Sequence, residues 1–343
     1  GVAAAIWLLW PWVLAFAGKG LSASAQQMSQ ELVWAFAPAA VLTLLTGLHA
    51  ARLRAHERHI NTLLDSVPAF SILVFVLAAG PGQGVWPLLW GTLLGYMVQS
   101  ASLHYLAKRV DGFWGRPRFR IRAEQWPALA HAAGIMLIGQ IAMSFVGPID
   151  QYTAASLGDN ANATLGYASR FISLMIGIGA ASVGRAALPV LADVTRRGDA
   201  IRARQIALKW SLMMVVIGLV IAALAAWLAP WGVGLLYERG AFTAADTVRV
   251  SSVLRWGLLQ LPFYFGVLIL VQLLASQHRY GMMATIAIIN FAVKALMNMW
   301  LAPQMGVHGI MLATSCMYAM SFASYFLVAL KPATIQVKPT ESK

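Results

Sequence analysis

The basic residues of this chain alternate along the sequence in a pattern that constrains how the chain can cross a membrane. Of its 25 Lys and Arg residues, 18 lie in every second gap between long apolar segments or in the C-terminal tail. Only Lys19, Arg239 and Arg249 lie in the intervening gaps. Cytoplasmic loops of membrane proteins carry such an excess of Lys and Arg, so the alternation predicts a multi-pass membrane protein and its orientation.

Composition agrees with this class. The 343 residues are 59% hydrophobic and 11% charged, with a mean hydropathy of +0.69, which excludes an ordinary soluble domain. A pI near 10.3 is also typical of nucleic-acid-binding proteins. Here, however, the cations are interspersed with spans of bilayer length, which favours cytoplasmic membrane loops and no nucleic-acid partner. The single cysteine, Cys316, excludes an intrachain disulfide and a cysteine-based metal cluster.

Ten apolar segments are each long enough to cross the hydrocarbon core. They are predicted as helices because the strands of a membrane barrel would alternate in polarity. The segments are 2–18, 32–51, 63–80, 85–107, 127–150, 163–192, 206–236, 243–275, 281–302 and 306–330. The predicted fold class is therefore an all-α polytopic membrane protein, with both chain ends in the cytoplasm.

The longest basic gap, residues 108–126, separates four of these helices from the other six. We predict a helical bundle over 1–107, a basic cytoplasmic linker over 108–126, a six-helix bundle over 127–331 and a cytoplasmic tail over 332–343. The linker fits either a solvated segment facing lipid headgroups or a short amphipathic surface helix. The chain begins with Gly1 and enters an apolar run at once, which is consistent with a missing N-terminal part.

The motifs of enzyme chemistry are absent from the sequence. It contains no Walker-type phosphate loop, and His56-Glu57-Arg58-His59 has the wrong spacing for a zinc protease. A membrane glycosyltransferase would place acidic residues at the cytoplasmic interface to hold a divalent metal, whereas cations dominate these gaps. We therefore predict that the protein is not an enzyme and has no metal and no cofactor.

Four cations lie inside apolar segments, where charge is costly and commonly functional: Arg170, Arg185, Arg255 and Lys294. Lys294 forms a four-residue-spaced stripe with Asn290 and Asn298 on one helix face. Such a stripe must face a partner helix, through interhelical hydrogen bonds, or a water-filled cavity. We favour a cavity with excess positive charge, because Lys and Arg bind phosphate oxygens through charge-assisted hydrogen bonds.

The predicted topology also assigns depths to the charged groups. Asp150 lies near the outer end of its helix, and Arg170 lies in the outer half of the next one. A short neutral connection makes these helices antiparallel neighbours, so we expect Asp150 and Arg170 to form an ion pair. Arg185 is expected to snorkel to the inner interface. We predict substrate binding by Arg170, Arg255 and Lys294, and coupling or ion pairing by Asp150, Asn290 and Asn298.

Several segments together resemble the lipid II flippase family (MurJ, also called MviN), within the multidrug/oligosaccharidyl-lipid/polysaccharide exporter superfamily. The resemblance is good over about 128–331, and the Gly-Ala-Phe-Thr-Ala segment at 240–244 is its most specific part. The matching stretches are 167–170, 187–191, 237–247, 274–277 with Tyr280, Asn298, and 306–315.

The resemblance implies a fold of fourteen helices, of which the ten predicted segments would be the third to the twelfth. The first bundle would then be partial and the second complete. It implies a transporter of the bacterial inner membrane that moves lipid II to the outer leaflet by alternating access, for peptidoglycan biosynthesis. The implied partners are a lipid-linked saccharide diphosphate, membrane lipids and a coupling ion or proton. Arg170 matches a family arginine of the central cavity, and Asp150 matches an acidic position linked in some members to ion coupling.

The sequence departs from the family pattern at three places. The arginines of the family's first two helices are not in this chain, and 67–72 lacks the family's Asn at the start of its fifth helix. Some members bind sodium through an Asn and an Asp four residues later. If Asn290 is that Asn, the second position is Lys294, whose ammonium cannot ligate a cation. We hypothesise that this tethered cation replaces sodium electrostatically.

The leading interpretation is thus a flippase for a polyprenyl-diphosphate-linked saccharide, most simply lipid II. An exporter of O-antigen or exopolysaccharide units needs the same cationic cavity and is the nearest alternative. A drug/cation antiporter should instead carry uncompensated carboxylates in its cavity. An inactive membrane scaffold is the remaining alternative.

Overall fold

The structure is a computed structural model that describes residues 2–17, 23–56, 61–80, 82–112, 126–158, 160–196, 199–277 and 279–330. All regular secondary structure in these ranges is helical, which confirms the all-α class, while the cytoplasmic location of the chain ends stays a prediction. The chain divides into two compact units, Gly1–Arg120 and Ile121–Lys343. Most of the predicted linker, the predicted tail and residues 57–59 of the His-Glu-Arg-His motif lie outside the described residues.

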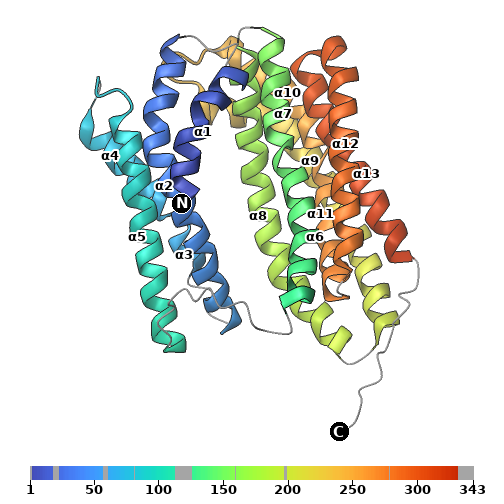
Figure 1. Cartoon of the computed structure of the whole chain (residues 1–343). Helices are drawn as coiled ribbons and strands as arrows, with labels where there is room; N and C mark the ends of the chain where they lie inside the picture. The colour runs from blue at the N-terminus through green and yellow to red at the C-terminus, as the bar shows by residue number, and fades with distance from the viewer. Residues whose placement is uncertain are drawn as a thin grey trace. The chain divides into compact units, whose positions relative to one another are not determined.

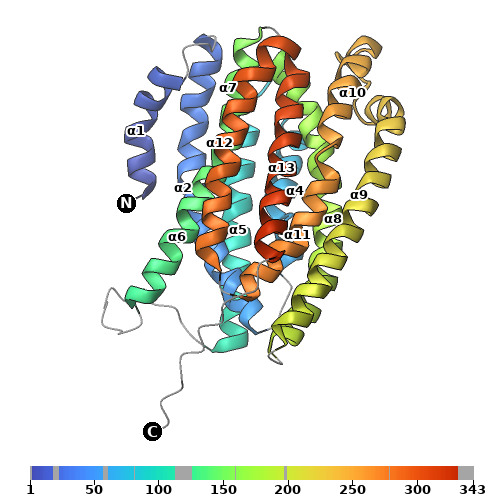
Figure 2. The ribbon, with the colours of Figure 1, turned by 90° about the vertical axis from the view of Figure 1, so that its right-hand side faces the viewer.

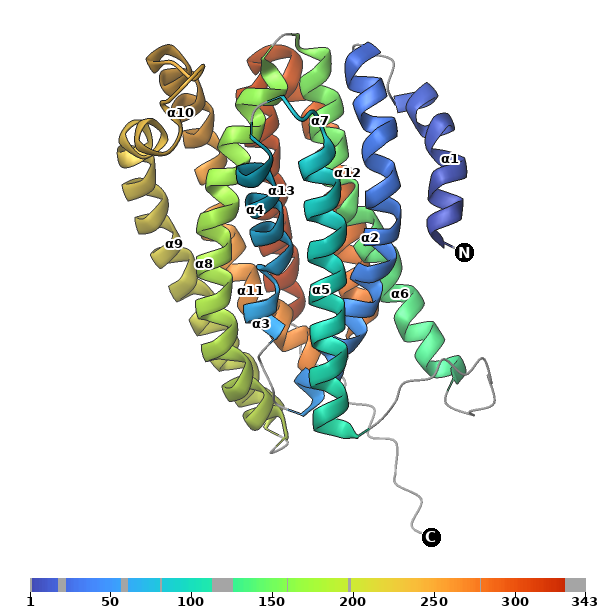
Figure 3. The ribbon, with the colours of Figure 1, turned by 90° about the vertical axis from the view of Figure 1, so that its left-hand side faces the viewer.

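The described part of unit 1 consists of five helices (Figure 3). Its helices are α1 (Val2–Ala17), α2 (Ala23–Ala55), α3 (Asn61–Leu64), α4 (Val67–Ala79) and α5 (Trp86–Asp111). Helix α5 packs against both α2 and α4. A Cβ atom at Gly91 would lie 2.7 Å from Cα of Ile72, and one at Gly95 would lie 2.6 Å from Cα of Pro68. These two glycines therefore allow the close backbone approach of α4 and α5 that is common between membrane helices.

Unit 2 contains the remaining helices, several of which run side by side (Figures 1 and 2). They are α6 (Trp126–Ser144), α7 (Val146–Ser156), α8 (Ala161–Arg196), α9 (Ala200–Tyr237), α10 (Ala244–Leu258), α11 (Leu261–Ser276), α12 (Tyr280–Met305) and α13 (Val307–Leu330).

Two predicted segments of unit 2 are each broken into two helices. The segment 127–150 is interrupted at Phe145, just before Gly147-Pro148, and the segment 243–275 is interrupted at Leu259 and Gln260, just before Pro262. Proline lacks an N–H group and its ring clashes with the preceding turn, so a helix kinks or restarts there. The apolar pattern predicted the spans correctly but not these breaks.

Seven helical stretches of the described residues are long and apolar enough to cross a membrane. They correspond to seven of the ten predicted segments, the second and the fifth to the tenth: Gln26–Leu53, Ala133–Ser156, Ala161–Ala180, Ile201–Tyr237, Ala244–Ser276, Tyr280–Met305 and Val307–Leu330. Helices α1 and α4 are apolar but shorter. Helix α5 is long but more polar, because it carries Gln99, His104 and Lys108.

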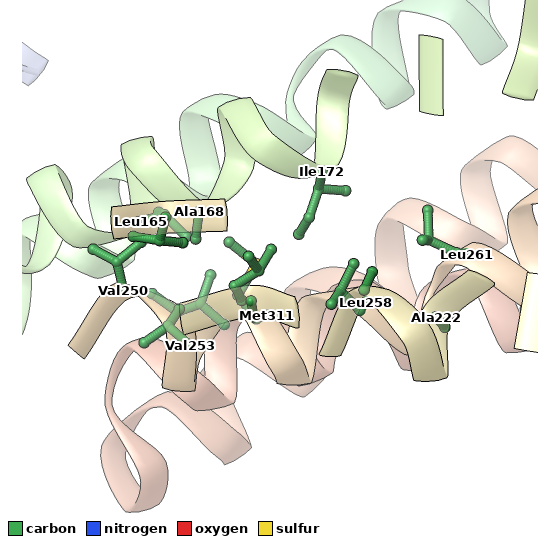
Figure 4. Close-up of a cluster of buried hydrophobic side chains, with 14 of the residues drawn as sticks. Leu165, Ala168, Ile172, Ala222, Val250, Val253, Leu258, Leu261 and Met311 are labelled. Atoms are coloured by element: carbon green, nitrogen blue, oxygen red, sulfur yellow. The ribbon is translucent and has the colours of Figure 1, made fainter. Parts of the chain in front are cut away.

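The core of unit 2 lies where α8, α9, α10 and α13 meet (Figure 4). Leu165 and Ile172 of α8 pack with Val253 of α10 and Met311 of α13, all of them buried. A second cluster joins the N-terminal part of α9 to α11 through Ala207 and Leu270, among others. These interlocked side chains position the polar groups described next.

The start of α10 is fixed by contacts of Thr243, which belongs to the 240–244 segment, and of its neighbours. Thr243 is the N-cap of α10 and forms a capping box with Asp246, whose carboxylate accepts the backbone N–H of Thr243 at 3.0 Å. The hydroxyl of Thr247 donates to the carboxylate of Glu238 at 2.8 Å, which ties the end of α9 to the start of α10. The segment therefore encodes a tight connection between two helices.

Candidate functional site

A fully buried ammonium group is the centre of the candidate site. The side chain of Lys294 on α12 is 0% exposed, and its Nζ lies 2.7 Å from Oδ1 of Asp150. Nζ also donates to Oγ1 of Thr314 at 2.7 Å, to the carbonyl oxygen of Ile310 at 2.9 Å and to Oδ1 of Asn298 at 3.1 Å. Four oxygen atoms from three helices therefore surround one positive charge.

The carboxylate of Asp150 contacts two donor groups, and its other side is partly exposed. Besides the ion pair, its Oδ1 accepts the Nδ2 amide of Asn298 at 2.7 Å. Its side chain is 16% exposed, and it lines a cavity of about 400 Å³ between α7 and α8, together with Asn162, Ser169 and others. An uncompensated charge in an apolar interior is costly, so the pairing with Lys294 stabilises both groups.

The local structure brings these side chains together. Asp150 lies in the first turns of α7, which restarts after the break at Phe145 and packs against α12. Helices α12 and α13 form a close antiparallel pair, and Gly309 lies directly against the backbone of Leu301. This contact leaves no space for a Cβ atom at 309. It places the Ile310 carbonyl and Thr314 within reach of Lys294.

The stripe predicted on α12 is present, and all three of its members are buried. Asn290 donates its amide to Oγ of Ser321 on α13 at 2.9 Å, while its Oδ1 has no partner among the described residues. The stripe faces α13 and α7 through hydrogen bonds. Interhelical hydrogen bonding, the alternative weighed against a cationic cavity, is thus the arrangement found around Asn290 and Lys294.

The predicted partner of Asp150 is wrong. The carboxylate pairs with Lys294 and not with Arg170, although α7 and α8 are neighbours as expected. Arg170 is exposed, on the face of α8 opposite to the buried residues Ala168 and Ile172. A residue two positions from each of these turns about 200° away on a helix, so it cannot share their face.

The three predicted substrate-binding cations lie in different surroundings. Lys294 is enclosed and neutralised, Arg170 is exposed on α8, and Arg255 lines a groove between α9, α10, α11 and α13. Within unit 2, the structure does not gather them in one pocket. Their role in substrate binding stays a prediction. Arg185 lies in α8, but its side chain is outside the described residues.

Unit 1 contains a separate polar cluster, which the sequence analysis did not identify. Arg52 on α2 and Asp111 on α5 form a two-pronged ion pair, with Nε–Oδ2 and Nη2–Oδ1 distances of 2.9 and 2.8 Å. Nη1 of Arg52 lies 3.2 Å from Nδ1 of His49, whose ring meets that of His104 edge-on. Hydropathy patterns do not reveal this cluster. They mark Arg52 and Asp111 only as charges of loops, and His49 and His104 only as residues within apolar segments.

A cavity of about 820 Å³ lies beside this cluster in unit 1, between α2, α4 and α5. Thr46 and Gln99 are more than nine-tenths buried there, and their Oγ1 and Oε1 atoms have no partner in the described part of the chain. Nε2 of Gln99 donates to Asp65 at 3.3 Å. The described lining contains no Lys or Arg, so the cavity offers hydrogen-bond acceptors and no positive charge.

The sequence also failed to reveal two of the four ligands of the Lys294 ammonium. Thr314 and the carbonyl of Ile310 lie one helical turn apart on α13 and carry no individual signal. Within the described ranges, no three His, Cys, Asp or Glu side chains lie together as a metal ligand set.

The all-helical fold, with its long apolar helices and a buried charge cluster, defines a polytopic helical membrane protein. The backbone is similar to that of a multidrug resistance MATE family transporter in an inward-facing conformation, with a TM-score of 0.73 and 15% identity over 96% of this chain and 76% of that one. It is also similar to lipid II flippase MurJ in an inward closed conformation, with a TM-score of 0.76 and 20% identity over 96% and 69% of the two chains. At such identities these similarities establish the fold alone.

Sequence comparison establishes the family. The sequence model of the family described as lipid II flippase MurJ matches residues 1–340, and the chain belongs to this family. It is a multi-pass protein of the bacterial inner membrane.

Its relatives include proteins named probable lipid II flippase MurJ. That of Bdellovibrio bacteriovorus is 25% identical over 66% of this chain and 43% of its own length. That of Rhizobium tropici is 28% identical over 72% and 47%, and that of Synechocystis is 26% identical over 86% and 58%. The chain thus spans about half the length of the curated relatives that it matches.

Proposed function

We propose that this chain acts in the transfer of a polyprenyl-diphosphate-linked saccharide, lipid II, across the bacterial inner membrane by alternating access. The observation that carries the proposal is family membership over residues 1–340. The helix breaks at Phe145 and at Leu259-Gln260 support it, because discontinuous helices beside buried polar groups are typical of secondary transporters. The reaction makes and breaks no covalent bond, so the chain needs no catalytic residues.

Depletion of the full-length protein in its own organism tests the cargo. We expect lipid II to accumulate in the inner leaflet, as measured by mass spectrometry of extracted lipids and by leaflet-specific labelling. Accumulation of an O-antigen or exopolysaccharide intermediate instead would replace lipid II as the cargo. Unchanged levels of every polyprenyl-linked intermediate would favour the inactive scaffold.

Arg170 is the residue we propose for contact with the diphosphate. Its guanidinium is exposed, it has no ion pair within the described ranges, and it follows Ser169, which lines the cavity that contains Asp150. Guanidinium groups bind phosphate oxygens in two-pronged, charge-assisted pairs. Arg170→Ala should abolish complementation of a flippase-depleted strain at normal membrane levels. Arg202→Ala, which removes an exposed arginine in the first turn of α9, is the matched control and should complement normally.

For coupling, we propose that the Lys294 ammonium serves as a tethered cation in place of a free sodium ion. It carries the charge of one sodium ion and already occupies the oxygen set of Asp150, Asn298, Thr314 and Ile310. A sodium ion does not fit the same set while the ammonium is bound there. Asn290, one turn away on α12, holds the helix pair together through Ser321.

Sodium titration of the purified protein tests this arrangement. The thermal unfolding temperature of the unchanged protein should be the same in sodium and in choline chloride at equal ionic strength. Lys294→Ser should create sodium-dependent stabilisation, because it removes the ammonium and leaves a carboxylate among oxygen ligands. Sodium-dependent stabilisation of the unchanged protein would refute the proposal.

A further inference from the structure

An apolar groove of about 430 Å³ lies on unit 2, and its lining shares no residue with the Lys294 cluster. Four helices contribute to it: α9, α10, α11 and α13. Arg255 is the one charged residue of this lining in the part of the chain that the structure describes. The polar hydroxyl of Ser315 is already used, since it donates to the carbonyl oxygen of Trp256 at 2.9 Å. The groove is therefore a hydrocarbon-like slot with a single cation.

The guanidinium of Arg255 is held in place by a backbone carbonyl group of α9 that lacks its usual hydrogen-bond donor. Pro230 lies inside α9 and has no N–H group, so the carbonyl oxygen of Ala226 lacks its normal helical donor. Nε of Arg255 donates to this oxygen at 3.1 Å. The two Nη groups of Arg255 have no partner within the described ranges, and the side chain is exposed. The guanidinium is thus oriented by one bond and keeps four N–H donors for an anion.

The level of Arg255 in the membrane follows from the helix rise. Along α9, Lys209 is a cytoplasmic cation of the predicted topology, and Ala226 is 17 residues further on, or roughly 26 Å at 1.5 Å per residue. The hydrocarbon core is roughly 30 Å thick. The Ala226 carbonyl and the bound Arg255 therefore lie close to the outer-leaflet boundary, where lipid phosphates lie.

The groove extends from this level towards the middle of the membrane. Its lining continues along the chain from Arg255 to Phe263, which corresponds to roughly 12 Å along a helix axis. Leu219 on one rim and Leu259 on the other are exposed. The cavity therefore opens on the apolar side surface of the unit. Its volume is in the range of small-molecule sites, which are roughly 300–1,000 Å³.

We propose that this groove binds an anionic phospholipid of the outer leaflet, with one acyl chain in the slot and the phosphate on Arg255. The apolar lining matches the chain, and the unpaired Nη groups match the phosphate, which accepts charge-assisted hydrogen bonds. A single arginine is also consistent with one phosphate of one lipid. This site is independent of the proposed transport cargo and of the Lys294 cluster.

Cys316 provides a direct test, because it is the only cysteine of the chain and it lines the groove. The full chain, purified in detergent, is treated with N-ethylmaleimide, and alkylation is followed by intact-mass spectrometry. Phosphatidylglycerol at ten times its Kd should slow alkylation by roughly tenfold, since only about one groove in eleven stays empty. Diacylglycerol and inorganic phosphate, which each offer one half of the ligand, should protect weakly or not at all.

Arg255→Gln should remove the protection by phosphatidylglycerol, and Arg255→Lys should restore part of it. Arg249→Gln, which changes another arginine of α10 outside this groove, is the matched control and should behave like the unchanged protein. Because Arg255→Gln also changes the Ala226 contact, its fold is checked by circular dichroism and thermal unfolding. Ala319→Phe is the second variant: a bulky group in the slot should make alkylation slow and independent of lipid.

Three outcomes would overturn the site: no slowing of alkylation by phosphatidylglycerol, equal slowing by diacylglycerol, or full protection retained in a folded Arg255→Gln variant. None of these depends on transport, so failure of the lipid site and failure of the proposed flippase function are separate results.

Discussion

Oδ1 of Asp150 lies 2.7 Å from the buried ammonium of Lys294, which joins the start of α7 to the middle of α12. The two residues are far apart in the sequence, and each is the main compensation for the charge of the other. The pair fixes the position of a short helix, α7, that begins where the apolar segment is interrupted at Phe145. It therefore links the stability of unit 2 to the site at which we propose coupling.

Lys294→Met should destabilise the protein strongly, because it leaves a buried carboxylate unpaired. Breaking a buried ion pair in this way costs about 3–5 kcal/mol. The loss should appear as a lower thermal unfolding temperature, followed by tryptophan fluorescence. The double variant Lys294→Met with Asp150→Leu should recover most of the stability, because apolar groups can replace a buried ion pair.

The same double variant separates structure from function. If the charges take part in coupling, the stable double variant should still fail to complement a depleted strain. Normal growth of that strain would show that the pair is only structural.

Arg52 and Asp111 should stabilise unit 1 by their two-pronged ion pair. The pair is only partly exposed, with side-chain values of 18% and 17%. Asp111→Asn should therefore cost about 1–3 kcal/mol, the range for hydrogen bonds to charged groups. Arg52→Lys should not preserve the geometry, since an ammonium cannot form the two parallel bonds. A double-mutant cycle with Arg52→Gln measures the coupling energy, and a value near zero would contradict this account.

Gly218 should be essential for the packing of α9 against α11. A Cβ atom at this position would lie 2.5 Å from Cα of Pro262 and 3.0 Å from its N. Gly218→Ala should therefore destabilise the protein by about 1–3 kcal/mol through overpacking. Gly177→Ala is the control: no atom lies within 4 Å of a Cβ there, so this helical change should be neutral or stabilising. Equal thermal stability of the two variants would rule out the close contact.

The capping box at Thr243 should contribute to the stability of α10. Thr243→Ala removes the acceptor for the backbone N–H of Asp246 and should cost about 1 kcal/mol, whereas Thr243→Ser should keep most of that stabilisation. Hydrogen exchange measured by mass spectrometry should become faster in the first turn of α10 in the alanine variant. Unchanged exchange there would mean that the cap does not limit local opening.

Much of the fold was accessible from the sequence, because a bilayer acts locally on each segment. Burial in hydrocarbon requires a long apolar helix, and cations collect on the cytoplasmic side. The stripe of Asn290, Lys294 and Asn298 was predictable for a similar reason, since four-residue spacing places side chains on one helix face. The break of 127–150 at Phe145 was not predicted, although Gly147-Pro148 is a visible signal for it.

The residues that contact the stripe could not be predicted from the sequence. Topology placed Asp150 and Arg170 on adjacent helices, yet the rotation of α8 turns Arg170 away from the core and α12 supplies Lys294 instead. The Ile310 carbonyl, Thr314 and the orphan carbonyl of Ala226 carry no side-chain pattern that marks them as ligands. The sequence by itself determined the membrane class, most of the spans and the faces of single helices, because these depend on spacing along one chain segment. Only the tertiary structure decided which charges meet, because that depends on how neighbouring helices rotate and approach, to within a fraction of a helical turn.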